Sequence, residues 1–207
     1  MSDARQRSES TQRNRRPLRD ALVVHLPATG ALLEIAAGSG EHAVFLAPAF
    51  PGLRWQPTDR DPAALASTAA WIAAEPAANL LPPLRLDVAD RPWPGGPYDA
   101  ILCANVIHIS PWSATEDLFG GASQALRSGG RLVTYGAYKV GGQHTAPSNA
   151  AFDLWLRDRD PAWGVRDVEA VDALLARAGS CRARGRRCPP TTCCCGSTGR
   201  DPVSYVA

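Results

Sequence analysis

Two glycines and a carboxylate form the pattern with the clearest chemical meaning in this sequence. Gly38 and Gly40 follow a short apolar run, and apolar residues at helical spacing continue from Glu41. Glycine tolerates positive φ and has no Cβ, so a ligand can lie almost against such a turn. Asp59 comes 19 residues after Gly40, the separation at which nucleotide-binding α/β domains hold ribose hydroxyls with a carboxylate. The pattern indicates a cradle for a nucleotide cofactor.

Further polar residues follow later strand-like segments. Asp87 ends the third of these segments, where it could contact an adenine amino group or cap its own loop, and both roles stay open. Asn105 and His108 follow the fourth segment, so we predict both as candidate catalytic residues, and Asn105 as a cofactor contact too. His108 could deprotonate an acceptor, because the pKa of histidine lies near neutral. The alternative for His108 is a structural role.

Aromatic and amide side chains near the fourth and fifth segments are candidates for an acceptor pocket. The residues concerned are Trp112, Tyr135, Tyr138 and Asn149. Their alternative role is to pack a long loop and the helix after it. The four histidines show no paired spacing of the kind found in metal sites, so no metal is expected.

The elements that must position these residues alternate regularly. Strands are expected at 31–36, 53–57, 84–88, 98–105 and 131–135, with helices beginning near Pro17 and at 41–49, 62–75 and 115–126. The nearly continuous apolar run at 98–105 is typical of a central parallel strand covered on both faces. The order predicts an α/β fold with a doubly wound, mainly parallel sheet, whose loops at the strand carboxyl ends bind the ligand.

Length and composition set the remaining bounds. With 207 residues and 45% hydrophobic content, we expect one domain at 17–179, preceded by a flexible polar segment at 1–16. A net charge of +2 gives no reason to expect nucleic acid as a partner. No apolar run approaches the ~20 residues that span a bilayer, and the amino terminus lacks a signal-peptide core, so a cytoplasmic protein is expected.

The glycine turn distinguishes between cofactors. A dinucleotide fingerprint would have a third glycine where this sequence has Ala43. The form E-x-A-x-G-x-G, from Glu34 through Ala36 to Gly40, instead resembles the first motif of class I S-adenosylmethionine-dependent methyltransferases. That resemblance implies that Glu34, Ala36 and both glycines belong to the cofactor site. It places Gly38 and Gly40 beside the methionine portion and Asp59 on the ribose.

Several segments narrow the resemblance to one family. In this order, EIAAGSGEHAVFLA, WQPTDRD, NVIHISPW, LFGGASQALRSGGRLVTYGAYKVGG and SNAAFDLWLRDRDPAWGVRD are similar to the DUF938 or methyltransferase-like 26 family, over residues 12 to about 179. The resemblance implies a Rossmann-like class I methyltransferase fold and methyl transfer to an acceptor that it does not identify. Alternatives are a protein that binds S-adenosylmethionine or S-adenosylhomocysteine without turnover, and a nicotinamide-dependent reductase.

The sequence changes character after Gly179. Five of the six cysteines lie between Cys181 and Cys195, with neither strand nor helix periodicity. Shifted by one nucleotide, the codons of Arg187 to Gly196 can spell Met-Pro-Ala-Asn-Asn-Leu-Leu-Leu-Arg, which resembles the closing strands of the family. We therefore hypothesise that a frameshift near Gly179, either genuine or a sequencing error, made 180–207 an aberrant, disordered tail and removed the closing strands of the sheet. The alternative is a cysteine metal or redox cluster.

Overall fold

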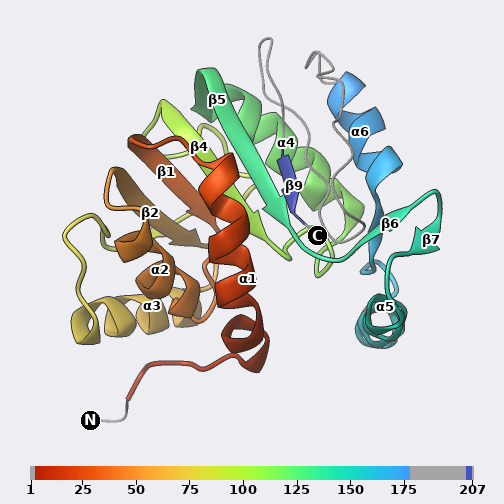
Figure 1. The fold of residues 1–207 in the computed structure, drawn as a ribbon, viewed down its shortest axis with the longest axis horizontal. Coiled ribbons are helices and arrows are strands. Elements are labelled where there is room, and N and C mark those ends of the chain that lie inside the picture. Colours follow the sequence, from red (N-terminus) through yellow and green to blue (C-terminus); the bar gives the residue numbers. More distant parts are fainter. Residues whose placement is uncertain (1–2, 178–203, 207) are drawn as a thin grey trace.

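The main sheet has six parallel strands in the order β3-β2-β1-β4-β5-β9 (Figure 1). The computed structural model describes residues 3–177 and 204–206. The strands of this sheet are β1 (Gly30–Ile35), β2 (Leu53–Asp59), β3 (Leu84–Arg85), β4 (Tyr98–Ala104), β5 (Leu126–Tyr135) and β9 (Ser204–Val206). The predicted doubly wound α/β fold is confirmed.

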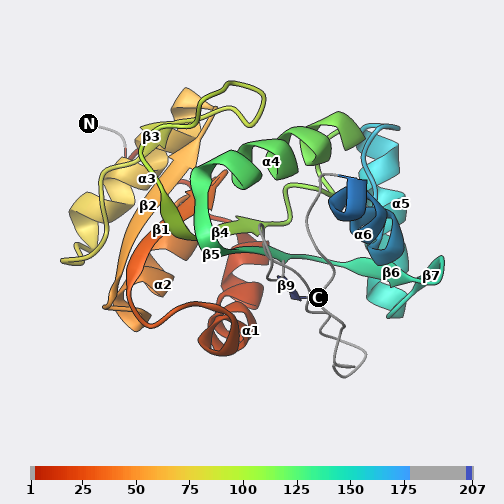
Figure 2. The ribbon, with the colours of Figure 1, turned by 90° about the horizontal axis from the view of Figure 1, so that it is seen from above.

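Helices cover both faces of this sheet, as Figure 2 shows for α1 and α4. The helices are α1 (Glu9–His25), α2 (Glu41–Leu46) with the short 3₁₀ turn η1 (Ala47–Ala49), α3 (Pro62–Ala74), α4 (Trp112–Ala125), α5 (Pro147–Arg159) and α6 (Val168–Arg177). One core joins Leu18 and Leu22 of α1 to Leu102 of β4, and the other joins Leu118 of α4 to Ile101. Neighbouring residues of β4 thus face opposite cores, which explains its continuous apolar sequence.

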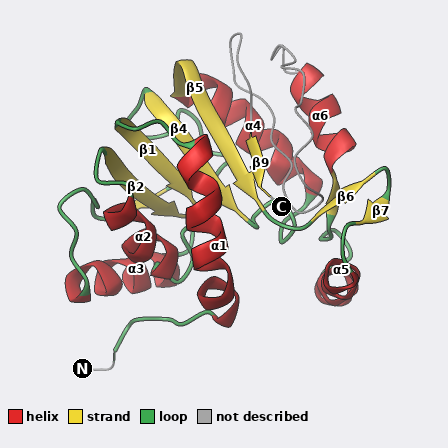
Figure 3. Ribbon diagram, in the orientation of Figure 1, coloured by secondary structure: helices red, strands yellow, loops and turns green. Residues whose placement is uncertain are grey.

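A small second sheet continues from the end of β5 (Figure 3). Its strands are β6 (Tyr138–Val140), β7 (Gln143–His144) and β8 (Arg166–Asp167), in the order β7-β6-β8. Strands of two or three residues have too few positions to show a period, so the sequence predicted only a loop here. Among the described residues, no helix is long and apolar enough to cross a membrane.

Helix α1 begins at Glu9, well before the predicted start near Pro17. The side chain of Ser8 caps the helix by accepting a hydrogen bond from the Thr11 N–H, so Pro17 lies within the helix. The flexible segment predicted at 1–16 therefore needs correction. Of its described residues, those from Glu9 onward are helical, and the N–H of Gln6 donates to Ser67 Oγ.

The other corrections concern element ends. Strand β2 continues to Asp59, which was expected in a loop, and β3 has only two residues. The helix expected at 115–126 is α4, which ends at Ala125, and the chain then enters β5 directly, with Gly129 inside the strand and a register shift between Tyr98 and Ala100 of β4. Glycine at φ +77° allows that irregularity within a strand.

The outer edge of β5 also differs from the expectation. Loss of the closing strands predicted an unpaired edge, yet Ser204–Val206 pair in parallel with Val133–Tyr135. That part of the expectation is wrong for the paired residues of β5, and the disorder predicted for 180–207 does not extend to this strand. The cysteine-rich stretch on which the frameshift hypothesis depends lies outside the described residues.

Candidate functional site

The carboxyl edge of the two central strands has a strained backbone. Among the described residues, Ala36 and Asn105 are the non-glycine residues with positive φ, at +52° and +63°. Ala36 follows β1 and Asn105 follows β4, and these strands are neighbours with Ile35 paired to Cys103. Such conformations cost about 1 to 3 kcal/mol and gather at ligand sites. They mark the edge at which this fold binds its ligands.

The two glycines of the turn have different roles. Gly38 has φ +58°, and a Cβ added there would meet no atom within 4 Å. Gly40 has φ +86°, and a Cβ added there would lie 2.6 Å from the Cα of Thr68 in α3. Gly40 therefore lets the turn pack against α3. Gly38 leaves open space beside the backbone, as a ligand cradle requires.

Asp59 lies where β2 ends and holds the glycine turn. Its Oδ2 accepts a hydrogen bond from the Gly38 N–H at 2.9 Å, and its Oδ1 accepts one from the Asp61 N–H at 3.0 Å. A carboxylate has about four acceptor positions, so Asp59 can also accept from hydroxyl groups of a ligand. Asp61 accepts from the Ala63 N–H and caps α3.

Glu34 lies within the sheet, behind the turn. Its side chain is buried, and the indole N–H of Trp55 donates to its Oε2 at 2.6 Å. Burial raises the pKa of Glu34 to about 7, with a further contribution from the nearby charge of Asp59. This places Glu34 as a support of the turn, with its carboxyl group held by Trp55.

Asp87 lies at the same edge, next to the end of β2. The N–H of Leu86 donates to the backbone oxygen of Asp59, which brings the two chain segments together. The Asp87 carboxylate accepts from the Ala89 N–H at 3.1 Å, and a guanidinium nitrogen of Arg60 lies 3.6 Å from it. The loop-capping role is therefore observed, and contact with an adenine group stays a prediction.

Asn105 and His108 converge on Gly136, just after β5. A Cβ added to Gly136 would lie 2.3 Å from Nε2 of His108 and 3.3 Å from Oδ1 of Asn105. The backbone fixes this arrangement, because the Asn105 N–H donates to the oxygen of Tyr135 and the His108 N–H donates to that of Asn105. The structure thus brings the two predicted catalytic candidates together.

The electrostatics of His108 differ from the expectation. The ring is fully buried, and neither ring nitrogen has a hydrogen-bond partner among the described residues. Burial, aided by the charge of Arg166, lowers the pKa of His108 to about 3. The assumed near-neutral pKa is therefore wrong. The ring is neutral at pH 7 and is a weak base there.

The predicted pocket residues do not all open onto this edge. Tyr138 is fully buried, its hydroxyl donates to Thr134 Oγ1 at 2.7 Å, and its ring meets that of His108 edge-on at 4.9 Å. Tyr138 therefore packs behind His108, which corrects its assignment as an open pocket residue. Tyr135 ends β5, and burial raises the pKa of its hydroxyl.

Trp112 and Asn149 lie on different helices. Trp112 begins α4, is partly buried against the core, and has the guanidinium of Arg166 5.8 Å from its ring centre. Asn149 lies in α5 and donates to Thr145 Oγ1, beside β7. Their roles in an acceptor pocket stay predictions.

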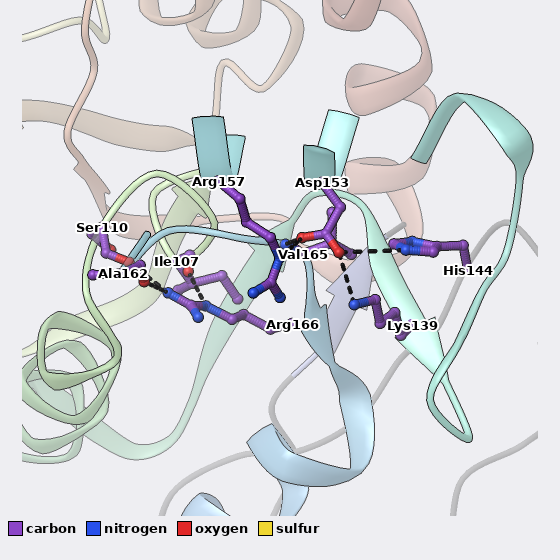
Figure 4. A network of polar contacts seen from close by, with 9 residues as sticks. All are labelled: Ile107, Ser110, Lys139, His144, Asp153, Arg157, Ala162, Val165 and Arg166. Atoms are coloured by element: carbon purple, nitrogen blue, oxygen red, sulfur yellow. Dashed lines mark hydrogen bonds and ion pairs between the residues drawn. The ribbon is translucent and has the colours of Figure 1, made fainter. Parts of the chain in front are cut away.

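Sequence reasoning missed an ionic cluster around the buried Asp153 (Figure 4). The carboxylate accepts hydrogen bonds from Lys139 at 2.8 Å, from Arg157 at 3.2 Å and from the Val165 N–H at 2.7 Å, and His144 Nε2 lies 3.4 Å away. Burial alone would raise the pKa of Asp153, but the bonds from Lys139 and Val165 outweigh it and lower the pKa.

The cluster is continuous with a clamp on the loop after β4. In Figure 4 the guanidinium of Arg166 points at this loop, and it donates to the backbone oxygens of Ile107 at 2.9 Å and Ser110 at 2.6 Å. The N–H of Gly164 donates to the oxygen of His108. The sequence indicates only a solvated charge run for the residues that follow on α5, Arg157, Asp158, Arg159 and Asp160. The signal that could have revealed the cluster is Asp153, because it shares one face of the helix with the buried Leu156, three residues later.

Known proteins share this fold. A family described as "Protein of unknown function (DUF938)" has a sequence model that matches residues 5–189. Among solved structures, an O-methyltransferase family protein from Burkholderia thailandensis is similar, with a TM-score of 0.72 and 18% identity over 87% of this chain and 55% of that chain. An O-methyltransferase family 2 protein from Planctomyces limnophilus, solved in complex with apigenin, is also similar. Its TM-score is 0.65, with 23% identity over 83% of this chain and 57% of that chain.

Human N-acetylserotonin methyltransferase, solved in complex with S-adenosylmethionine, is also similar. The TM-score is 0.68 and the identity 15%, over 86% of this chain and 49% of that chain. This chain therefore spans about half the length of these three proteins. At such identities the likeness shows the fold, a Rossmann-like methyltransferase fold.

Proposed function

The chain belongs to the DUF938 family, and on that premise we propose that it is an S-adenosylmethionine-dependent methyltransferase. The acceptor in this proposal is a small molecule that is still unidentified, and the site of action is the cytoplasm. Support comes from the methyltransferase fold and from the geometry of the carboxyl edge. Neither a nucleic acid nor a membrane is part of the proposal.

The observation that carries the proposal is the open glycine turn among carboxylates. Gly38 leaves space for a ligand, and the carboxylates of Asp59 and Asp87 lie at the same edge. S-adenosylmethionine has a cationic sulfonium, an ammonium group and ribose hydroxyls, which suit such groups. A dinucleotide has a pyrophosphate, and the fingerprint that binds it has a third glycine where this chain has Ala43. The residues present therefore fit S-adenosylmethionine.

The roles of the residues follow from this fit. Bound S-adenosylmethionine supplies a methyl group that can be displaced directly from sulfur. Asp59 accepts hydrogen bonds from the ribose, and Gly38 permits close approach of the backbone. Asn105 and the neutral His108 form part of the wall between the ends of β4 and β5. Displacement depends chiefly on alignment and exclusion of water, which a buried wall provides without a strong base.

Calorimetry with three ligands tests the cofactor. S-adenosylmethionine and S-adenosylhomocysteine are expected to bind with one-to-one stoichiometry, and NADH is expected not to bind. Binding of NADH alone would reverse the assignment and favour the nicotinamide-dependent reductase. Incubation with labelled S-adenosylmethionine and a panel of small hydroxyl, amine and thiol acceptors then tests transfer.

The pKa of His108 favours one further candidate, a protein that binds the cofactor without turnover. A buried histidine with a pKa of about 3 is a poor proton acceptor at pH 7. An acceptor that must lose a proton would then find no strong base in His108. Tight cofactor binding without transfer to any acceptor of the panel would favour this candidate over the methyltransferase.

A further inference from the structure

The residues before and at the start of α1 form an N-terminal arm, residues 5–12, which is attached to α3. The N–H of Gln6 donates to Ser67 Oγ at 2.8 Å, and the indole N–H of Trp71 donates to the backbone oxygen of Gln6 at 2.9 Å. The guanidinium groups of Arg5 and Arg7 lie 5.0 and 5.1 Å from the ring centre of Trp71. Backbone bonds and cation–π contacts therefore both hold the arm.

The same arm is bonded to the glycine turn. Oε2 of Glu41 accepts from the Ser8 N–H at 2.6 Å and from the Ser39 hydroxyl at 3.1 Å, and its Oε1 accepts from the Gln12 amide at 3.4 Å. A second link passes through Ser67, whose hydroxyl donates to the backbone oxygen of Ser39 at 2.7 Å. Ser39 thus lies between the two attachments of the arm.

Glu41 requires these donors because it is only 4% exposed. A buried carboxylate is costly unless hydrogen-bond donors satisfy it. Two of its three donors, Ser8 and Gln12, belong to the arm, and the third, Ser39, belongs to the turn. Release of the arm would leave Glu41 undersatisfied within the turn, so the docked arm and the shape of the turn depend on each other.

We propose that the N-terminal arm is part of the cofactor site and that Glu41 is the positioning residue that couples the docked arm to the glycine turn. The inference rests on the proposed function for the identity of the ligand. Glu41 acts through Ser39 and the adjacent glycines. Coupling of this kind is reciprocal: the factor by which the docked arm favours the cofactor equals the factor by which the cofactor favours the docked arm.

Trypsin cleavage of the full chain between Arg7 and Ser8 measures arm release, because the Ser8 N–H is the group bonded to Glu41. We expect saturating S-adenosylmethionine to slow this cleavage by at least about fivefold. Glu41→Gln should speed cleavage without cofactor, and it should weaken cofactor binding by at most the factor by which the cofactor slows cleavage of the unchanged chain. Ser67→Ala, which removes the second link, should act in the same direction. Glu9→Gln is the matched control, since Glu9 is an exposed carboxylate of the arm itself, at the start of α1.

The outcomes separate the coupling from the function. If Glu41→Gln and Ser67→Ala release the arm and cofactor affinity stays unchanged, the coupling is overturned while the methyltransferase proposal stands. Cleavage that neither substitution changes also overturns the role of Glu41. A full chain that binds no S-adenosylmethionine overturns the proposed function and the coupling together. If Glu9→Gln changes the cleavage rate and the cofactor affinity as much as Glu41→Gln does, the specific role of Glu41 is overturned.

Discussion

At the scale of single residues, Asp59 makes the most direct prediction. Asp59→Ala removes an acceptor for the ribose hydroxyls and also the group that holds the Gly38 N–H. We expect at least a roughly tenfold loss of S-adenosylmethionine affinity by calorimetry, since a lost bond to a charged group costs about 1.5 to 3 kcal/mol. Asp61→Ala, which removes only the cap of α3, is the control. Unchanged affinity in Asp59→Ala would remove Asp59 from the site.

The two glycines of the turn predict opposite phenotypes. Gly38→Ala places a methyl group in open space at φ +58°, a conformation that Ala36 already adopts, so folding should lose only about 1 kcal/mol while cofactor affinity falls strongly. Gly40→Ala places a methyl group against the backbone of Thr68, so this variant should unfold at a clearly lower urea concentration than the unchanged chain. Urea unfolding and calorimetry on both variants check this. Full cofactor affinity in Gly38→Ala would place the ligand elsewhere.

The pKa of Glu34 predicts how stability depends on pH. Its folded value of about 7 lies above the ordinary value of 4.5, so the folded protein binds the extra proton between these two pH values. The extra proton stabilises the folded protein fully below about pH 4.5. This stabilisation is lost as the pH rises through about 7, so the free energy of unfolding falls by about 3 kcal/mol. Glu34→Gln, which keeps an acceptor for Trp55, should lack this fall. If the free energy of unfolding, measured in urea, falls equally with pH in the unchanged chain and in Glu34→Gln, then Glu34 is not the group that binds this proton.

At the scale of elements, the loop between β4 and α4 depends on Arg166. A guanidinium can donate to two carbonyl groups at fixed angles, as Arg166 does to Ile107 and Ser110, whereas an ammonium group cannot copy that geometry. Arg166→Lys should therefore speed hydrogen exchange in residues 105–112 almost as much as Arg166→Ala. Arg131→Ala, which removes a bond to the oxygen of His25, should leave this loop unchanged. Normal protection in Arg166→Lys would show that charge alone suffices.

The sequence predicted those elements whose residues report a strong local pattern. The apolar run of β4 and the glycine turn before α2 were predicted within about one residue. Burial on two faces requires a continuous apolar run, and positive φ favours glycine, so both are visible in the sequence. The start of α1 was missed because Pro17 resembles a first-turn residue, while the cap by Ser8 depends on geometry. Asp153 was missed because three of its four partners, Lys139, His144 and Val165, come from outside its own helix.

Electrostatic properties of the site were the least predictable from sequence. His108 lies in the loop between β4 and α4, where a solvated ring is expected, yet the fold buries its ring completely and lowers its pKa to about 3. The pKa of Glu34 is raised instead, because burial within the sheet outweighs the hydrogen bond from Trp55, which lowers it. Such shifts arise from long-range packing, which neither spacing nor composition encodes.

At the scale of the whole molecule, the second sheet and the main sheet share one core. Tyr138 of β6 and Val171 of α6 belong to the same buried cluster as Cys103 of β4. Helix α5, in contrast, exposes Leu154 and Trp155, and its buried Asp153 is bonded to Lys139 and Val165. The molecule should therefore unfold as one unit in which the ionic cluster of Asp153 contributes to the stability of β4.

Cys103 provides the measurement, because its thiol is buried and burial raises its pKa to about 12, so it can be alkylated only after the main sheet opens. Asp153→Asn removes the charge that Lys139 and Arg157 contact, at a cost of about 2 kcal/mol. If the molecule is a single cooperative unit, the rate of Cys103 alkylation should then rise roughly thirtyfold. Peptide mass spectrometry measures this rate. An unchanged rate, with faster hydrogen exchange confined to α5 and β7, would show that the second sheet opens independently of the main sheet.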